Sequence, residues 1–502
     1  MADAVDLLVI GGGVNGAGIA RDAAGRGLSV VLCEKGDLAE ATSSRSSKLV
    51  HGGLRYLEHY EFRLVREALV EREVLLRSAP HIVWPTRFVL PQSPQDRPAW
   101  MVRIGLFLYD HIGGRRTLPG RRALDLSREP EGAALQSHYV KGFEYSDCCA
   151  DDARLTILAA LDARERGARI LTRTLVESAR RDGGVWRATV FDMANGQRRE
   201  IVARALVNAA GPWVDQVIER IEGARTKYAV KLVKGSHIVT PKFFDGPQAY
   251  LMQNHDRRVI FVIPYQGDLA LIGTTDIPFT GAPETVAADE EEIVYLLAAV
   301  AGYFRNAPKR ADVIEAWSGV RPLFDDGHGN PSEVTRDYVL ELDAADGAPL
   351  LNVFGGKITT FRRLAEQALQ KLKPFFATAR GDWTAQATLP GGEIDDGDFE
   401  PFVARLAAKY PFLSPSLARH YARLYGARAL KLLGVASAMA DLGRRFGPDF
   451  FETEARYLIA EEWAQTADDI LVRLTKHGLR MTADERAAFE RWMQTDASAA
   501  AQ

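Results

Sequence analysis

The sequence predicts an α/β fold: a discontinuous Rossmann-like dinucleotide-binding domain, a mainly antiparallel β-sheet cap and a C-terminal all-α domain. Three observations predict this fold. A glycine-rich turn follows the first apolar run of the chain, short runs of strand composition fill 231–318, and the chain beyond residue 389 is rich in Ala, Leu and Arg at helical spacing. Because 502 residues are too many for one hydrophobic core, we expect two or three packed units.

The stretch 6–35 predicts a strand, a tight turn, a helix and a parallel strand, and its turn contains Gly11, Gly13 and Gly16. Glycines in this pattern let the backbone approach a pyrophosphate, whose charge lies at the helix N-terminus. Glu34 ends the second strand at the distance where an acid accepts hydrogen bonds from ribose hydroxyls. A carboxylate there disfavours a 2′-phosphate, so FAD or NAD fits better than NADP.

The next segment, 42–53, is rich in small hydroxyl residues and ends in two glycines. Such a loop lets the backbone lie against a flat ligand and donate hydrogen bonds to it. We therefore expect cofactor contacts from Ser43, Ser44, Ser47, His51 and Gly52.

An amphipathic helix is predicted over 61–77, and a short, strongly apolar helix over Trp100–Tyr109. The second helix is flanked by Arg97, Arg103, Arg115, Arg116, Arg121 and Arg122. An aromatic stripe with a basic collar is typical of a helix that lies in a membrane interface. The alternative is a core helix with solvated ends.

The α/β pattern restarts at about residue 145, with a helix over 153–165 and a strand over 169–174. A hairpin over 185–203 follows, and then an apolar strand, 205–211, that ends at Gly211. The cap sheet comes next, with a helix over 289–304.

A second glycine turn follows the apolar strand 350–354 and precedes an amphipathic helix; it contributes Gly356, Lys357 and Thr359. A nicotinamide enzyme needs one such turn, whereas the longer FAD uses a second helix terminus at its isoalloxazine end. The pattern therefore favours FAD. The predicted domains are an FAD-binding domain (1–60, 145–225 and 318–385), a helical, membrane-facing insertion (61–144), a substrate cap (226–317) and a C-terminal helical domain (386–502).

The composition is close to neutral, with 63 Lys and Arg against 66 Asp and Glu, and it gives no reason to expect nucleic-acid binding. Cys33, Cys148 and Cys149 lack metal-binding spacing, so we expect packed thiols, no metal and a reducing compartment. No apolar run approaches the ~18 residues of a spanning helix, and none resembles a signal peptide. We expect a cytoplasmic protein, either free or attached to a membrane surface.

The glycine fingerprint, the segment SSRSSKLVHGGLRYLE (43–58) and several later motifs resemble the FAD-dependent glycerol-3-phosphate dehydrogenases of aerobic bacteria. The resemblance covers nearly the whole chain. It implies oxidation of sn-glycerol 3-phosphate to dihydroxyacetone phosphate by hydride transfer to FAD, with a membrane quinone as the acceptor. It also implies a homodimer attached to the inner face of the cytoplasmic membrane, which favours the interfacial interpretation of Trp100–Tyr109.

The resemblance also implies roles for individual residues. His237 is the expected base and Arg321 an electrostatic catalyst, and the substrate contacts are Arg55, Tyr56, Arg336 and Lys357. Two of these roles have structural alternatives, since His237 can be a packed histidine and Arg336 can form a surface ion pair with Asp337.

Three other functions stay open at this stage. The first is an amine or amino-acid oxidase of the same superfamily, which would need one Arg for a carboxylate and an apolar cage for the amine. The second is a soluble oxidase that uses oxygen. The third is a non-catalytic flavin-binding regulator whose C-terminal helices bind a partner.

Overall fold

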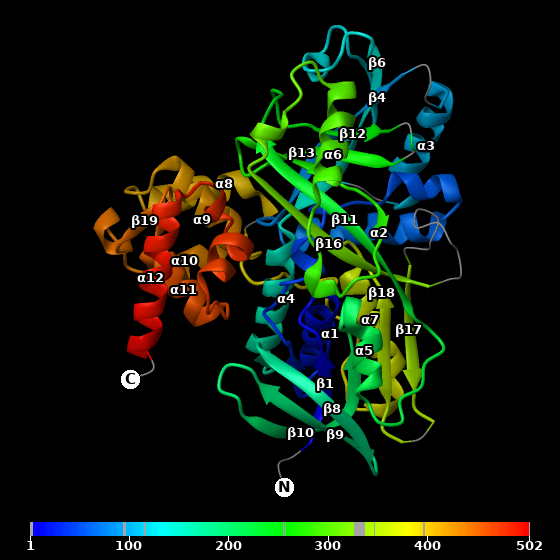
Figure 1. The fold of residues 1–502 in the computed structure, drawn as a ribbon, viewed down its shortest axis with the longest axis vertical. Coiled ribbons are helices and arrows are strands. Elements are labelled where there is room, and N and C mark those ends of the chain that lie inside the picture. The colour runs from blue at the N-terminus through cyan, green and yellow to red at the C-terminus, as the bar shows by residue number, and fades with distance from the viewer. Residues whose placement is uncertain are drawn as a thin grey trace.

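The computed structural model describes residues 4–500, apart from 94–96, 115–116, 255, 257, 326–336, 346 and 395–396. Arg115, Arg116 and Arg336 therefore lie outside the described residues. Two sheets are stacked along the long axis of the molecule, and a helical C-terminal region packs beside them (Figure 1).

The first sheet is the predicted dinucleotide-binding sheet, with the order β17-β18-β10-β1-β2-β7 and an antiparallel ribbon, β8–β9, that continues from β10. The pairs β1–β2, β2–β7, β1–β10 and β10–β18 are parallel. Its strands are β1 (Val5–Ile10), β2 (Val30–Cys33), β7 (Arg169–Leu171), β8 (Thr174–Asp182), β9 (Val185–Asp192), β10 (Arg198–Asn208), β17 (Tyr338–Asp343) and β18 (Leu350–Gly355). Because these strands come from three distant parts of the chain, the predicted discontinuity is confirmed.

The second sheet has the order β15-β11-β14-β13-β12-β4-β6-β3, with β16 paired to β11 and β5 to β6. All of its pairs are antiparallel except β12–β4. Its strands are β3 (Leu49–Val50), β4 (Val83–Gln92), β5 (Arg122–Asp125), β6 (Lys141–Ala150), β11 (Val230–Pro241), β12 (Ala249–Gln253), β13 (Val259–Tyr265), β14 (Leu269–Gly273), β15 (Ile277–Pro278) and β16 (Glu315–Phe324). The insertion 61–144 therefore contributes strands to the cap sheet as well as the helices α2 (Phe62–Ser78) and α3 (Ala99–Ile112).

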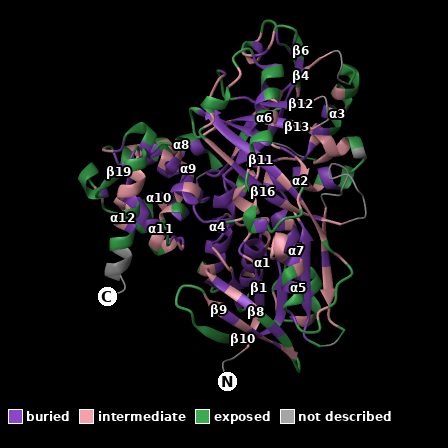
Figure 2. Ribbon diagram, in the orientation of Figure 1, coloured by how far each residue is buried: buried purple, intermediate pink, exposed green. Residues whose placement is uncertain are grey.

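Helix α6 (Glu290–Tyr303) packs against the cap sheet and begins with a capping box between Asp289 and Glu292. In the first domain, α1 (Val14–Gly25), α4 (Asp152–Glu165) and α7 (Phe361–Leu372) share one hydrophobic core with the C-terminal helices. α5 (Val214–Glu219) lies at a smaller core around Phe354. Almost all of α4 is buried, since C-terminal helices lie beside it (Figures 1 and 2).

The C-terminal region consists of α8 (Phe399–Lys409), α9 (Pro415–Tyr425), α10 (Ala429–Leu433), α11 (Glu452–Glu461), a π-helical turn η11 (Asp469–Leu474) and α12 (Ala483–Ala500). A two-stranded sheet, β19 (Arg445–Gly447) and β20 (Phe450–Phe451), interrupts the predicted all-α pattern. The region is fixed to α4 by a fully buried ion pair between Arg154 and Glu462, in which Arg154 Nη2 lies 2.9 Å from Glu462 Oε1. Removing one partner of such a pair leaves an uncompensated buried charge.

Short turns of 3₁₀ helix connect these elements: η1 (Thr42–Ser44), η2 (Leu54–His59), η3 (Pro130–Gly132), η4 (Gly211–Trp213), η5 (Pro283–Thr285), η6 (Arg310–Asp312), η7 (Lys373–Phe375), η9 (Gly426–Arg428), η10 (Met439–Leu442) and η12 (His477–Leu479).

Helix α3 presents most of its apolar stripe to solvent. The exposed fractions are 62% for Trp100, 52% for Ile104 and 47% for Phe107, and Met101 and Leu108 are also exposed. The core interpretation of this helix is therefore wrong for most of its apolar residues. It is right for Leu106 and Tyr109, which are buried; the Tyr109 hydroxyl donates to Asp147 and accepts from Gly52 N. None of the helices among the described residues has the length and apolar character needed to cross a bilayer.

Candidate functional site: a cavity joining two glycine turns to a buried histidine

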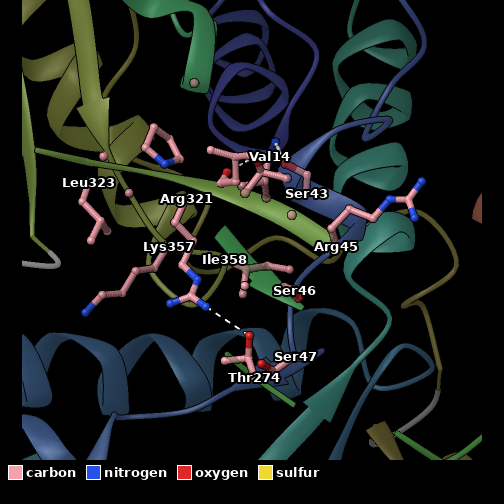
Figure 3. A pocket seen from close by; sticks show the side chains of 18 of the residues that line it. Val14, Ser43, Arg45, Ser46, Ser47, Thr274, Arg321, Leu323, Lys357 and Ile358 are labelled. Carbon is pink, nitrogen blue, oxygen red and sulfur yellow. Dashed lines mark hydrogen bonds between the residues drawn. The ribbon is translucent and has the colours of Figure 1, made fainter. Parts of the chain in front are cut away.

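A cavity of about 1360 Å³ extends from the first glycine turn to the cap sheet. It is lined by residues from both sheets and from the loop 39–47 between them. Figure 3 shows part of its wall, where a dashed line marks the hydrogen bond that Arg321 donates to Thr274. The two sheets thus enclose one large site.

The glycines of the first turn are required by close backbone contacts. A Cβ atom on Gly16 would lie 1.9 Å from the carbonyl oxygen of Gly11, and one on Gly11 would lie 2.5 Å from that of Ala209. Gly11 also has a φ of +107°, which L side chains rarely adopt. This geometry lets the backbone at the N-terminus of α1 approach a pyrophosphate closely.

Glu34 lies where the fingerprint predicts it, in the cavity wall at the end of β2. Its carboxylate accepts hydrogen bonds from Gly12 N (2.6 Å) and Gly36 N (2.8 Å). Burial raises the pKa of Glu34, and the two amide donors oppose this effect. The side chain is therefore fixed for contact with a ribose.

The second glycine turn reaches the first through Asn15. The Asn15 side-chain amide donates to Gly355 O (3.1 Å), and its buried Oδ1 atom has no hydrogen-bond partner among the described residues. Gly356 has a φ of +110°, and a Cβ atom there would lie 2.6 Å from Asn15 Nδ2. An unsatisfied buried acceptor between two glycine turns fits a long dinucleotide that spans both, so the residues present fit FAD.

His237 lies on β11 and is 3% exposed. Its Nε2 atom is 2.9 Å from Ser47 Oγ, and its buried Nδ1 atom has no hydrogen-bond partner among the described residues. Trp317 stacks on the imidazole with a centroid distance of 5.9 Å. Burial, together with the nearby cations Arg321 and Lys48, lowers the pKa of His237 to about 3. The ring is therefore neutral and able to accept a proton.

Arg321 lies on β16, next to β11 in the sheet. Its guanidinium donates to Asp276 Oδ1 (2.7 Å), Thr275 O (2.9 Å) and Thr274 Oγ1 (3.1 Å). These contacts hold a cation near His237 in the wall of the cavity. A held guanidinium can stabilise an anion that develops beside it.

Three of the four other expected substrate contacts line the cavity. Arg55 and Tyr56 come from η2, and the Lys357 ammonium lies 4.1 Å from the centroid of the Tyr56 ring. Arg336 falls outside the described residues. Arg55, Lys357 and Arg321 thus place three cations around one cavity, a suitable arrangement for a phosphate.

Some of the expected cofactor residues line the cavity and others do not. Most line the cavity: Gly11, Gly13, Glu34, Ser43, Ser47, His51, Gly211, Gly356 and Thr359. Gly16 supports the turn from behind, Gly52 donates to Tyr109, and Ser44 offers its carbonyl oxygen to Lys48. The Ser43 hydroxyl accepts from Val14 N (2.9 Å), so it also caps the start of α1.

The residues of the cavity wall that sequence reasoning missed include Asn15, Thr274, Asp276 and Trp317. One signal for two of them was present, since the polar run Thr274–Asp276 directly follows the apolar strand 269–273. Nothing in the sequence indicates that Trp317 stacks on His237, because that contact depends on the pairing of β11 with β16.

Among the described residues, one group of possible metal ligands lies in the C-terminal region: His420, Glu454 and His477. Both oxygens of the buried Glu454 carboxylate already meet histidine nitrogens, at 2.7 and 3.1 Å. Burial raises the pKa of Glu454, but the two histidines outweigh this effect and hold it well below its usual range. Hydrogen bonds therefore account for this group.

A prediction follows from the contact between Gly235 and Arg321. A Cβ atom on Gly235 would lie 2.1 Å from Arg321 Nη2 and 2.6 Å from Thr274 Oγ1. Because both are mobile side-chain atoms, Gly235→Ala should fold and bind FAD but displace the guanidinium. We expect kcat/KM to fall by about tenfold to a hundredfold in steady-state assays. Gly302→Ala, where a Cβ meets nothing within 4 Å, is the matched control, and equal activity of the two variants would contradict the assigned position of Arg321.

Comparison with known proteins shows similarity over nearly the whole chain. A family model described as FAD dependent oxidoreductase matches residues 6–362, and one described as the C-terminal domain of alpha-glycerophosphate oxidase matches 383–498. The chain is 62% identical to the D-erythritol 1-phosphate dehydrogenase of Brucella abortus over 487 residues, and 51% identical to the aerobic glycerol-3-phosphate dehydrogenase of Escherichia coli over 489 residues. Each alignment covers 97% of both chains.

The fold also matches a solved structure, the glycerol-3-phosphate dehydrogenase of Bacillus halodurans complexed with FAD. The two chains are 28% identical with a TM-score of 0.76, over 98% of this chain and 94% of that one. FAD is therefore the cofactor of this chain, and the chain is an oxidoreductase. Its fold, its cofactor site and its sequence together place this chain in the FAD-dependent oxidoreductase family.

Proposed function

We propose that this chain oxidises the secondary alcohol of a polyol phosphate, with sn-glycerol 3-phosphate as the substrate and dihydroxyacetone phosphate as the product. The observation that carries the proposal is that the neutral, buried His237 lines one cavity with the first glycine turn and with the cations Arg55, Arg321 and Lys357. An amine oxidase would need a single carboxylate anchor, whereas these cations suit a phosphate dianion. The relatives named as glycerol-3-phosphate dehydrogenases support the same substrate class.

The residues divide the reaction among them. Bound FAD supplies the hydride acceptor. His237 accepts the hydroxyl proton, while Arg321 stabilises the negative charge that develops on the carbinol oxygen. Arg55 and Lys357 hold the phosphate, so the carbinol carbon stays fixed during the transfer. The buried position of His237 keeps water from competing for its lone pair.

A second candidate substrate is D-erythritol 1-phosphate. The relative named for it shares 62% identity with this chain, against 51% for the Escherichia coli enzyme named for glycerol 3-phosphate. The two substrates share the phosphate, and erythritol has one more CHOH unit. The phosphate-binding cations and His237 suit both, so the choice rests on residues that meet the extra carbon.

The test is kcat/KM for both substrates with an artificial electron acceptor. A preference of about tenfold or more, which corresponds to ~1.4 kcal/mol of transition-state binding, identifies the physiological substrate class. Turnover of amino acids or sarcosine, with neither polyol phosphate oxidised, would overturn the proposal.

We further propose that electrons pass to a membrane quinone and that α3 attaches the chain to the inner face of the cytoplasmic membrane. Two observations support this. The exposed stripe of α3 is large and apolar, and Met101, Ile104 and Leu108 also line the flavin cavity. A hydrophobic acceptor that enters from the bilayer would therefore meet the same cavity as the flavin. A homodimer is proposed from the family resemblance alone.

The membrane proposal predicts the behaviour of the double variant Phe107→Glu/Leu108→Glu. It should lose sedimentation with anionic vesicles and retain FAD, because both side chains are exposed on α3. Arg97 and Arg121 of the basic collar are paired with Glu58 and Asp110, so apolar insertion should dominate and salt should weaken binding only modestly. Val435→Glu, at a fully exposed site in the C-terminal region, is the control. Unchanged sedimentation of the double variant would refute the role of α3.

A further inference from the structure

The C-terminal region reaches the active site through a buried lysine. Lys476 lies between η11 and η12, and its ammonium is 2.7 Å from Asp151 Oδ1. Both side chains are buried. Asp151 is also the N-cap of α4, where it accepts from Arg154 N. The C-terminal region therefore supplies the countercharge for an acid at the start of a helix in the FAD-binding domain.

The next acid, Asp152, holds the loop that leads to the active site. It is fully buried and accepts from Lys48 Nζ (2.8 Å) and Ser46 Oγ (2.8 Å). Lys48 also donates to Ser44 O (3.0 Å) and has a φ of +57°, in the left-handed region that a lysine rarely adopts. The loop Ser44–Lys48 is thus held in a strained conformation by one carboxylate.

This loop carries the partner of His237. Ser47 Oγ is 2.9 Å from His237 Nε2, and Lys48 Nζ is 5.5 Å from the centroid of the Trp317 ring that stacks on the imidazole. A continuous series of contacts therefore runs from Lys476 through Asp151, Asp152 and Lys48 to His237.

The charges along this series depend on one another. Two adjacent buried carboxylates repel each other unless each has a cation, and here Lys476 serves Asp151 while Lys48 serves Asp152. Burial raises the pKa of Asp151, yet Lys476 and Lys48 outweigh it and hold that pKa below its usual value. Without Lys476, Asp151 would be a buried, uncompensated anion that competes with Asp152 for Lys48.

We propose that Lys476, a residue of the C-terminal region, is a positioning residue for the reaction. It neutralises Asp151, so that Lys48 stays paired with Asp152. The loop that carries Ser47 is thereby held with Ser47 against His237. The inference rests on the proposed function, since it assigns a role in the same site. It gives the C-terminal region a part in catalysis without any contact between that region and the substrate.

The experiment compares three full-length holoenzymes. Lys476→Met removes the charge and keeps the length of the side chain. Lys476→Met/Asp151→Asn removes both charges, and Asn still caps a helix N-terminus. Arg480→Met is the matched control, since the exposed Arg480 also joins the C-terminal region to another part of the chain, but through Asp268 and Gln266 rather than through Asp151.

For Lys476→Met we expect full FAD content, a KM within about threefold of the unmodified chain and a kcat lower by about tenfold or more. The acid limb of its pH profile should move to higher pH, because Lys48 moves away from His237 and its charge no longer lowers the pKa of the imidazole. The double variant should recover kcat to within about threefold of the unmodified chain, and Arg480→Met should match that chain throughout.

A Lys476→Met enzyme with unchanged kcat and pH profile would overturn the inference, as would a double variant that is as slow as the single one. Should Lys476→Met yield no soluble yellow protein, the double variant decides by the same criterion of recovered or lost kcat. Failure of the unmodified chain to oxidise either polyol phosphate contradicts the proposed function instead, so the two failures are distinguishable.

Discussion

Asn in place of His237 should lower the rate of flavin reduction by about a hundredfold to ten-thousandfold while the protein stays yellow. Asn is close to His in size but cannot accept a proton at neutral pH. No positioned base would then remain to take the hydroxyl proton of the alcohol. The measurement is the single-turnover rate of flavin bleaching under anaerobic conditions. His138→Asn, at an exposed histidine, is the control. A His237→Asn enzyme that reduces its flavin at the unmodified rate would remove His237 from the mechanism.

The ionisation of His237 should also set the pH dependence of the reaction rate. Burial, with Arg321 and Lys48, lowers the pKa of His237 to about 3 in the folded chain. The acid limb of kcat/KM, which reports the free enzyme, should therefore lie well below the value of about 6.5 for an ordinary histidine. A bound phosphate offsets the charge of Arg321, so the acid limb of kcat should lie at higher pH than that of kcat/KM.

The sign of the stability effect follows from the same shift. Between pH ~6.5 and ~3 the unfolded chain binds a proton at His237 that the folded chain does not. This residue therefore lowers the free energy of unfolding progressively as the pH falls through that interval, and has no such effect above it. Chemical denaturation of the unmodified chain and of His237→Asn at several pH values measures the difference, and equal pH dependence of the two would contradict the buried, neutral assignment.

The second large effect that we predict is the loss of FAD binding in Gly16→Ala. The new Cβ would lie 1.9 Å from the carbonyl oxygen of Gly11, a backbone atom that cannot move without opening the turn. We expect purified protein with less than about a tenth of the normal FAD content and an affinity for added FAD weaker by about a hundredfold or more. Absorbance of the bound flavin measures both quantities, with Gly302→Ala as the control. A Gly16→Ala protein that is fully yellow would show that the turn is not the pyrophosphate site.

The sequence predicts the first domain well because its signals are local. Gly11 and Gly16 are needed within one turn, and Glu34 follows at a fixed distance along the same βαβ unit. The second glycine turn was predicted as a second helix terminus for FAD; its contact with the first turn through Asn15 was not predicted. The turn and the position of Glu34 depend on short-range backbone geometry, which composition and spacing report directly.

The features that the sequence does not predict depend on long-range pairing. β4 and β6 pair with each other and join the cap sheet through β12, although the insertion 61–144, which contains β4, was predicted to be helical. Tyr109 belongs to an apolar stripe by spacing, yet it points inward because its hydroxyl finds Asp147, 38 residues away. The link from Lys476 to Asp151 spans 325 residues, and no local pattern indicates it.

The competing functions differ in what they require of the same cavity. A non-catalytic flavin-binding regulator needs neither His237 nor Arg321, so neither the His237→Asn nor the Gly235→Ala variant would change a measured rate. An oxidase would form peroxide rapidly from the reduced enzyme without a quinone. The neutral histidine and the held guanidinium in one cavity favour a catalyst over a regulator.

The most direct test is an anaerobic titration of the purified yellow protein with sn-glycerol 3-phosphate and, separately, with D-erythritol 1-phosphate, followed by the visible absorbance of the flavin. The account predicts bleaching by at least one of the two polyol phosphates and none by amino acids or sarcosine. Flavin that stays oxidised with both polyol phosphates but is bleached by an amino acid or by sarcosine would contradict it.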